Sequence, residues 1–107
     1  MATVSLKNIQ SAVSGNRIKW RYHALLRFQE RGITRDQAKQ VMEQGEILEH
    51  HDNAKPFPKC LMMAMIGPNR PLYVALAYDD ATDYVHVITV HRLDPAKWDD
   101  PWTRRKP

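Results

Sequence analysis

The sequence has little of what marks a disulfide-bonded, metal-thiolate or membrane protein. It contains one cysteine, Cys60, which excludes an internal disulfide and a zinc site built from several thiolates. Its longest apolar runs, residues 60–66 and 72–78, are far shorter than the roughly 20 residues of a membrane-spanning helix. Residues 1–10 carry no apolar stretch of the kind found in signal peptides. We therefore expect no secretory signal, no membrane partner and a reducing, cytoplasmic location.

What the sequence does contain fits one ordinary globular domain. The chain has 107 residues, of which 43% are hydrophobic and 26% are charged. These values are typical of folded proteins and unlike those of disordered chains. A chain of this length can bury a core without disulfide or metal staples. We predict a single domain over residues 1–107, in which residues 94–107 form a C-terminal tail that packs back through Trp98 and Trp102.

Positive charge is concentrated in one part of the chain. The net charge is +4 with neutral histidines. Residues 17–35 hold six basic side chains, five of them arginine, against the single acid Glu30, whereas residues 36–52 are mainly acidic. The planar guanidinium of arginine suits phosphate because it donates two parallel hydrogen bonds. An anionic polymer is therefore one interpretation of the basic cluster, and a solvated face without a partner is the other.

The first half of the chain has helical periodicity. Apolar residues recur at spacings of three and four in three segments, which predicts helices over residues 5–13, 23–31 and 35–44. Gly32 follows the second helix in the usual cap position. Thr34 and Gln37 form a capping box at the start of the third. Residues 17–22 alternate between apolar and basic side chains, so a short strand and an extended lead-in both fit.

The second half of the chain changes to a period of two. Strands are predicted over residues 47–50, 59–66, 72–78 and 84–92. The short connections between the last three favour antiparallel hairpins. The predicted fold class is therefore α+β, with two or three N-terminal helices packed on one face of an antiparallel sheet of about four strands.

One face of the second predicted helix is polar. At 100° per residue, the buried stripe consists of Ala24, Leu25 and Phe28. A separate arc about 100° wide carries His23, Arg27, Glu30 and Arg31. An imidazole beside guanidiniums supplies a proton carrier near neutral pH and fixed positive charge, which phosphate transfer requires. An exposed polar face with an Arg27–Glu30 ion pair at i, i+3 remains the alternative.

The last predicted strand ends in polar residues. Val85 and Val87 are expected to be followed on the same face by Thr89 and His91. A helix over that end would gather His23, Arg27, Thr89 and His91 in one cleft. The alternatives are that Thr89 is present because threonine favours β-strands and that His91 is an ordinary surface residue.

No metal site or cofactor is expected. His50 and His51 would point to opposite faces of a strand, and with Asp52 they match no known metal-ligand spacing. Cys60 opens an apolar strand and is expected to be a small core residue, because a reactive thiol needs an exposed, electropositive setting.

Several motifs together resemble a small bacterial family of unassigned function. The longest, residues 20–34, reads WRYHALLRFQERGIT. The likeness continues through GEILE at residues 45–49, RPLYV at 70–74 and VITVH at 87–91, followed by Asp94, Pro95 and Trp98. Such proteins resemble the RelE/ParE-like part of the barnase–colicin–RelE ribonuclease fold, which agrees with helices followed by a meander.

The resemblance implies a metal-independent endoribonuclease that is the toxin of a toxin–antitoxin pair. RNA, including ribosome-bound mRNA, and an antitoxin protein would be its partners. The implied catalytic residues are His23, Arg27, Thr89 and His91, although relatives often carry tyrosine in place of His91. The implied substrate-binding residues are Arg21, Arg31 and Arg92. The alternative is a non-catalytic RNA- or ribosome-binding domain, or a protein-interaction domain, on the same fold.

Overall fold

Capping residues define the helix ends in the computed structural model, which describes residues 4–68, 70–92, 98–99 and 104–105. The helices are α1 (Leu6–Ser14), α2 (Tyr22–Arg31) and α3 (Arg35–Gln44). The predicted capping box is confirmed: the Gln37 backbone N–H donates to Thr34 Oγ1 at 3.1 Å, and Gln37 Oε1 accepts from the Thr34 N–H at 3.0 Å. Gly32 ends α2 with φ 62°, a left-handed conformation that glycine adopts without steric cost.

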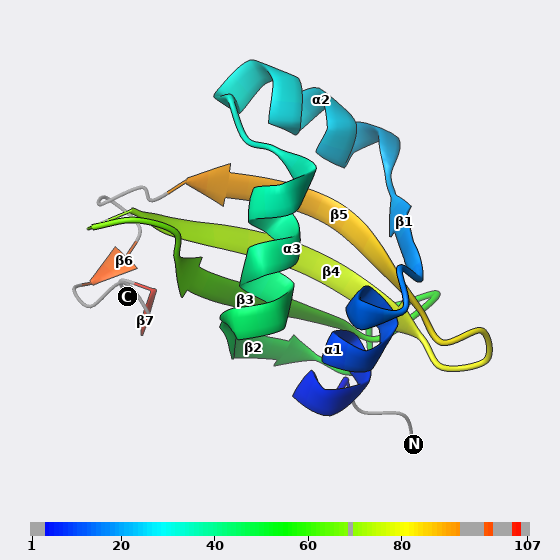
Figure 1. Ribbon diagram of the computed structural model, residues 1–107. Helices are drawn as coiled ribbons and strands as arrows, with labels where there is room; N and C mark the ends of the chain where they lie inside the picture. Colours follow the sequence, from blue (N-terminus) through cyan, green and yellow to red (C-terminus); the bar gives the residue numbers. More distant parts are fainter. Residues whose placement is uncertain (1–3, 69, 93–97, 100–103, 106–107) are drawn as a thin grey trace.

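The sheet has five strands and mixed direction (Figure 1). Its strands are β1 (Ile18–Trp20), β2 (Glu46–His51), β3 (Lys59–Met65), β4 (Pro71–Asp79) and β5 (Tyr84–Arg92), in the order β1-β5-β4-β3-β2. The predicted antiparallel meander of four strands is present as β2 to β5. The strand count and the purely antiparallel sheet were wrong, because β1 adds a parallel neighbour to β5. Alternation in residues 17–22 shows an extended segment and carries no information on its pairing partner.

The helices do not all lie over one face, which corrects a second expectation. Helices α1 and α3 cross one face of the sheet, whereas α2 runs along the edge beside β5 (Figure 1). The reason is that β1 has only three residues and pairs with β5 only as far as Val87. Helix α2 follows at once and covers the edge of β5 that β1 leaves free.

The main core lies between the helices and the sheet. Ala38, Val41 and Met42 of α3 are fully buried. Of the stripe predicted on α2, Ala24 and Phe28 are buried and Leu25 is partly buried against the core. They pack with inward-facing strand residues that include Cys60, Met62, Leu76 and Val85. Burial raises the pKa of the Cys60 thiol to about 12, and the Asp52 carboxylate adds to the increase. Cys60 is thus a core residue, as its sequence position indicates.

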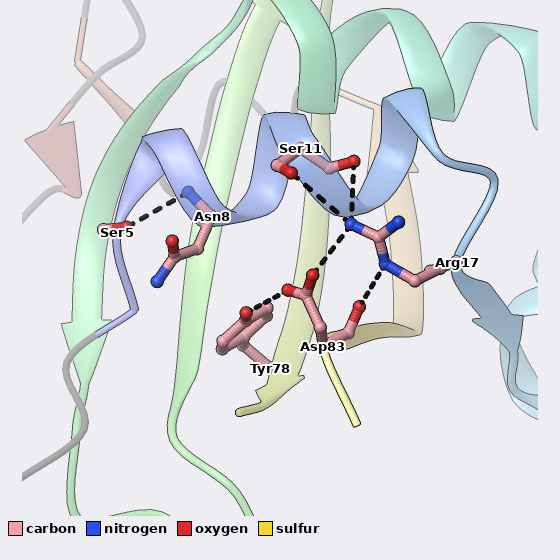
Figure 2. A network of polar contacts seen from close by, with 6 residues as sticks. All are labelled: Ser5, Asn8, Ser11, Arg17, Tyr78 and Asp83. Atoms are coloured by element: carbon pink, nitrogen blue, oxygen red, sulfur yellow. Dashed lines mark hydrogen bonds and ion pairs between the residues drawn. The ribbon is translucent and has the colours of Figure 1, made fainter. Parts of the chain in front are cut away.

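A polar network ties α1 to the β4–β5 hairpin (Figure 2). Arg17 Nη2 lies 2.8 Å from Asp83 Oδ2 and 3.1 Å from the Ser11 carbonyl oxygen, and Arg17 Nε donates to the Asp83 carbonyl at 3.0 Å. Tyr78 donates its hydroxyl hydrogen to the same carboxylate. Because this bond stabilises the protonated phenol, it raises the pKa of Tyr78 to about 12. The Arg17 side chain therefore has a structural role, because it joins α1 to the β4–β5 hairpin.

The side chains of β5 change face at a β-bulge. Val87 pairs with Leu76 and Thr89 pairs with Ala75, so Ile88 is an extra residue between them. Val85 and Val87 consequently face the helices, whereas Thr89 and His91 lie on the opposite side of the sheet, which we call the distal face. The expectation that all four share one face was wrong, because simple alternation assumes an unbroken ladder.

The predicted C-terminal tail falls mostly outside the described residues. Within it, β6 (Trp98–Asp99) and β7 (Arg104–Arg105) form a two-stranded antiparallel pair. The packing expected of Trp98 and Trp102 lies outside what the structure describes. None of the described helices has the length and apolar composition that crossing a membrane requires.

Candidate functional site

A pocket of about 350 Å³ opens on the distal face where α2 begins. Three parts of the chain meet there: the start of α2, the loop between β2 and β3, and the sheet, through the first residue of β3, the end of β4 and the middle of β5. Its lining residues are Arg21, Tyr22, His23, Pro56, Phe57, Lys59, Ala77 and Ile88. The pocket therefore combines aromatic and aliphatic surface with two cationic side chains and one imidazole.

The first turn of α2 is held against β5 by its backbone. The Arg21 N–H donates to the Val87 carbonyl oxygen at 3.1 Å, directly after β1 ends. No side chain caps the helix at Arg21, and its first turn contains no acidic residue. Uncapped helix N–H groups favour anions nearby. Tyr22 is 70% exposed, and His23, whose ring centroid lies 6.2 Å from that of Tyr22, is also an exposed residue. Both residues are therefore accessible to a ligand.

The floor of the pocket is set by strand register. Lys59 pairs with Ala77, and Ala77 pairs with His86 on the next strand. Directly paired residues point to the same face of a sheet, at a spacing of about 5 Å between strands. Lys59, the first residue of β3, and Ala77, near the end of β4, therefore lie side by side on the distal face. The ammonium of Lys59 thus belongs to the same surface as Arg21 and His23.

Most of the other arginines of the basic cluster are bonded to the protein itself. Arg27 forms an ion pair with Glu30, with 2.7 Å between Nη1 and Oε2, which confirms the pairing that helix spacing allowed. Arg31 Nη1 donates to the Val90 carbonyl oxygen at 2.6 Å. In contrast, the side chains of Arg21 and Lys59 make no hydrogen bond or ion pair to another described residue. The pocket therefore holds positive charge that the described part of the chain does not compensate.

His86 lies next to the pocket and was not singled out from the sequence. Its side chain is 7% exposed, and neither ring nitrogen has a hydrogen-bond partner among the described residues. Its ring centroid lies 5.0 Å from that of Phe57, a lining residue. Burial, followed by the charges of Arg21 and Lys19, lowers the pKa of His86, and Asp79 opposes the change. The surroundings of His86 therefore favour the neutral imidazole.

The structure brings together only part of the predicted site. His23 and Arg21 line the pocket, whereas Arg27, Arg31, Thr89, His91 and Arg92 do not. The His91 ring stacks on Tyr73 with a centroid distance of 5.1 Å. Arg92 Nη2 donates to the Gly32 carbonyl oxygen at 3.1 Å and its Nε to the Arg31 carbonyl at 3.3 Å. Arg92 therefore reinforces the junction of α2 and β5, whereas His91 packs against β4.

The residues that sequence reasoning missed are Tyr22, Phe57, Lys59 and His86. Each stands in a segment with another evident role: a helix start, a proline-containing loop or an apolar strand. Strand register places Lys59 and His86, whereas Tyr22 and Phe57 are placed by the helix start and the loop that meet the sheet there. Neither relationship is visible without the fold. Within the described residues, no three His, Cys, Asp or Glu side chains gather as a metal-ligand set.

Comparison with protein families matches residues 20–92, more than half of the chain, to the family described as "Domain of unknown function (DUF4258)". The match runs from Trp20, the last residue of β1, to Arg92, the last residue of β5, and so includes every residue that lines the pocket. Neither the curated proteins nor the solved structures contain a match.

Proposed function

The chain belongs to the DUF4258 family, and we propose that it is a cytoplasmic endoribonuclease whose active site is the pocket at the start of α2. The observation that carries this proposal is the position of His23 beside the uncompensated cations Arg21 and Lys59 in one pocket. A proton carrier next to fixed positive charge is what RNA cleavage through the 2′-hydroxyl requires. As the earlier resemblance implies, the enzyme would be the toxin of a toxin–antitoxin pair with a RelE-like fold.

The proposed reaction assigns one role to each polar group. Arg21, with the N-terminus of α2, binds the scissile phosphate and stabilises charge that develops on its oxygens. His23 removes the proton of the 2′-hydroxyl as its oxygen attacks phosphorus. The Lys59 ammonium acts as the acid and protonates the 5′-oxygen as the bond between that oxygen and phosphorus breaks. The products are a 2′,3′-cyclic phosphate and a 5′-hydroxyl end.

The charge of the pocket favours a mechanism without a divalent metal ion. Arg21 and Lys59 repel a cation and attract the phosphate directly. We therefore expect cleavage of RNA in the presence of a chelator.

Cleavage of an end-labelled RNA in chelating buffer tests the proposal. We expect His23→Ala to lower the cleavage rate at least 100-fold with an unchanged unfolding curve, since general base catalysis contributes about 10²–10⁴-fold. Arg21→Ala and Lys59→Ala should also lose activity. Lys7→Ala on α1 and Arg70→Ala, at the opposite end of β3 and β4 from Lys59, remove the same charge elsewhere and should leave the rate unchanged. Absence of cleavage in the folded protein overturns the endoribonuclease, and absence of RNA binding as well overturns the RNA site.

One observation favours binding without cleavage as the second candidate. Thr89 and His91, the further catalytic residues implied by the resemblance, lie outside the pocket and leave His23 as its one lining histidine. A pure binding domain would retain salt-dependent affinity in His23→Ala and lose it in Arg21→Ala. Growth of a host after induction of the parent and of His23→Ala separates the two roles in the cell, because only cleavage should depend on the imidazole.

A further inference from the structure

The buried imidazole of His86 has hydrogen-bonding groups that the described fold does not use. Buried polar groups in proteins are nearly always bonded, and an exception calls for an explanation. His86 is 7% exposed, and both of its ring nitrogens lack a partner among the described residues. A neutral imidazole offers one N–H donor and one acceptor nitrogen. The fold thus keeps a donor and an acceptor unpaired at one point.

His86 lies directly behind Phe57, one of the residues that line the pocket. Phe57, in the loop between β2 and β3, lines the pocket and lies over His86 with ring centroids 5.0 Å apart and planes inclined by 33°. The cross-strand partner of His86 is Ala77, which also lines the pocket. A sideways displacement of one phenyl ring would therefore open His86 to a ligand in the pocket.

Burial and the neighbouring charges disfavour the cationic form of His86. Burial lowers its pKa most, Arg21 at the start of α2 and Lys19 on β1 lower it further, and Asp79 on β4 opposes the change. The ligand that suits this position therefore needs a donor and an acceptor of its own, rather than a negative charge. The remaining walls, Tyr22, Phe57 and Ile88, offer planar and aliphatic surface.

We propose that the pocket contains a nucleobase subsite, in which His86 hydrogen-bonds the edge of one unpaired base once the Phe57 ring has moved aside. The base would stack on Phe57 or Tyr22, and its phosphate would lie on Arg21 and Lys59 at the rim. The inference rests on the proposed function, because it takes RNA as the ligand. It restricts the substrate to single strands, since a paired base has no free edge and cannot leave its stack without cost.

Imidazole NMR of the intact protein tests the subsite without relying on activity. The probes are a short single-stranded 2′-O-methyl RNA, which lacks the attacking hydroxyl, an abasic strand of equal length and the corresponding duplex. We expect the base-containing strand to shift the ring signals of both His23 and His86. The abasic strand should shift His23 alone, and the duplex should leave His86 unchanged.

Two failures are distinguishable. If the single strand shifts His23 and leaves His86 unmoved, the nucleobase subsite is wrong and the proposed RNA site stands. If neither histidine responds, the proposed function fails, and the inference fails with it. A His86 shift of equal size with the duplex also overturns the subsite, because it would show that an unpaired base is not needed.

Variants separate base recognition from a structural role. His86→Leu removes both unpaired nitrogens and keeps a buried side chain, so we expect an equal or higher unfolding temperature and at least tenfold weaker binding of the base-containing strand. Binding of the abasic strand should not change. His86→Gln retains a donor and an acceptor and should recover part of the affinity. If His86→Leu binds the base-containing strand as tightly as the parent does, His86 does not recognise the base. If a variant fails to fold, the NMR measurement on the parent protein still tests the subsite.

Discussion

Arg31 Nη1 donates a 2.6 Å hydrogen bond to the Val90 carbonyl oxygen and so joins the last turn of α2 to the second half of β5. The bond satisfies a strand carbonyl that β1, paired only with residues 85–87, does not reach. Arg92, at the end of β5, also links the two elements, because its side chain donates to the carbonyl oxygens of Arg31 and Gly32 at the end of α2. Two arginines expected to bind substrate thus hold a helix in place of a sixth strand.

Loss of the Arg31 contact should reduce stability. In Arg31→Met the aliphatic part of the side chain remains, but the Val90 carbonyl loses its charged donor. Hydrogen bonds to charged groups contribute about 1.5–3 kcal/mol, and partial exposure places this one near the lower end. We expect a decrease of about 1–2 kcal/mol in the free energy of unfolding, measured with urea. Arg31→Lys should lose less, and an unchanged unfolding midpoint in Arg31→Met would contradict this role.

Gly32, which ends α2 in a left-handed conformation, allows the cost of backbone strain to be measured separately from steric clashes. A Cβ at Gly32 would meet no heavy atom within 4 Å, although φ is +62°. Any cost of Gly32→Ala therefore comes from the backbone conformation, which costs other residues about 1–2 kcal/mol. We expect that decrease in thermal or urea stability. Gly32→Asn should recover part of it, because asparagine tolerates this region; equal effects of the two substitutions would contradict the explanation.

The network around Asp83 predicts both a stability change and a tyrosine titration. Asp83 has φ 58° and receives hydrogen bonds from Arg17 and Tyr78. Asp83→Ala loses these bonds and a residue that tolerates the left-handed region, so we expect a loss of about 2 kcal/mol. The pKa of Tyr78, about 12 in the parent, should fall toward its usual value near 10. Ultraviolet titration measures this change, and Asp83→Asn, which keeps the backbone preference, should lose less stability.

The buried His86 predicts how stability depends on pH. Its folded pKa is below the usual value of 6.5, so the unfolded chain takes up a proton first as the pH falls. The contribution of His86 is therefore fully present above pH 6.5 and is lost as the pH decreases from there through the folded pKa. His86→Leu should flatten this part of the stability profile. Urea unfolding of both proteins between pH 8 and pH 5 checks it, and parallel profiles would contradict the prediction.

Two arginines near the start of α2 should differ in their effect on RNA binding. Each phosphate contact contributes about 0.7 to the slope of log affinity against log salt for single strands. We expect Arg21→Ala to reduce the slope by about that amount, whereas Arg27→Ala should have a smaller effect because Glu30 already pairs with Arg27. Fluorescence anisotropy at several salt concentrations measures both. A larger effect of Arg27→Ala would favour the arrangement that the family resemblance implies.

Local signals were sufficient for most of the secondary structure. The capping box of Thr34 and Gln37 and the glycine at position 32 depend on residues within one helical turn, so they are visible without the fold. The last strand was predicted with its observed bounds, Tyr84–Arg92. The burial of Ala24 and Phe28 also followed from helical spacing. These features are determined by neighbouring residues and by the polarity pattern.

The candidate site depended on relationships that polarity patterns do not contain. The extra residue at Ile88 turns Thr89 and His91 away from the helix-covered face, and nothing in an alternating apolar run marks a bulge. Lys59 and His23 line the same pocket because β3, β4 and β5 pair in sequence and α2 starts where the pairing of β1 with β5 ends. His86 was hidden in an apolar strand, and its unpaired nitrogens are visible only with its neighbours in place.

The sequence by itself therefore determined the three helices, the four strands of the meander, their order and the basic segment that includes Arg21 and His23, but left the strand at residues 18–20 open. Only the tertiary structure decided which charges stay uncompensated, because Arg27 and Arg31 find acceptors while Arg21 and Lys59 do not. The physical reason is range. Helix caps and periodicity act between residues close in sequence, whereas pairing register and ion pairing are settled by segments up to about sixty residues apart, as with Arg31 and Val90.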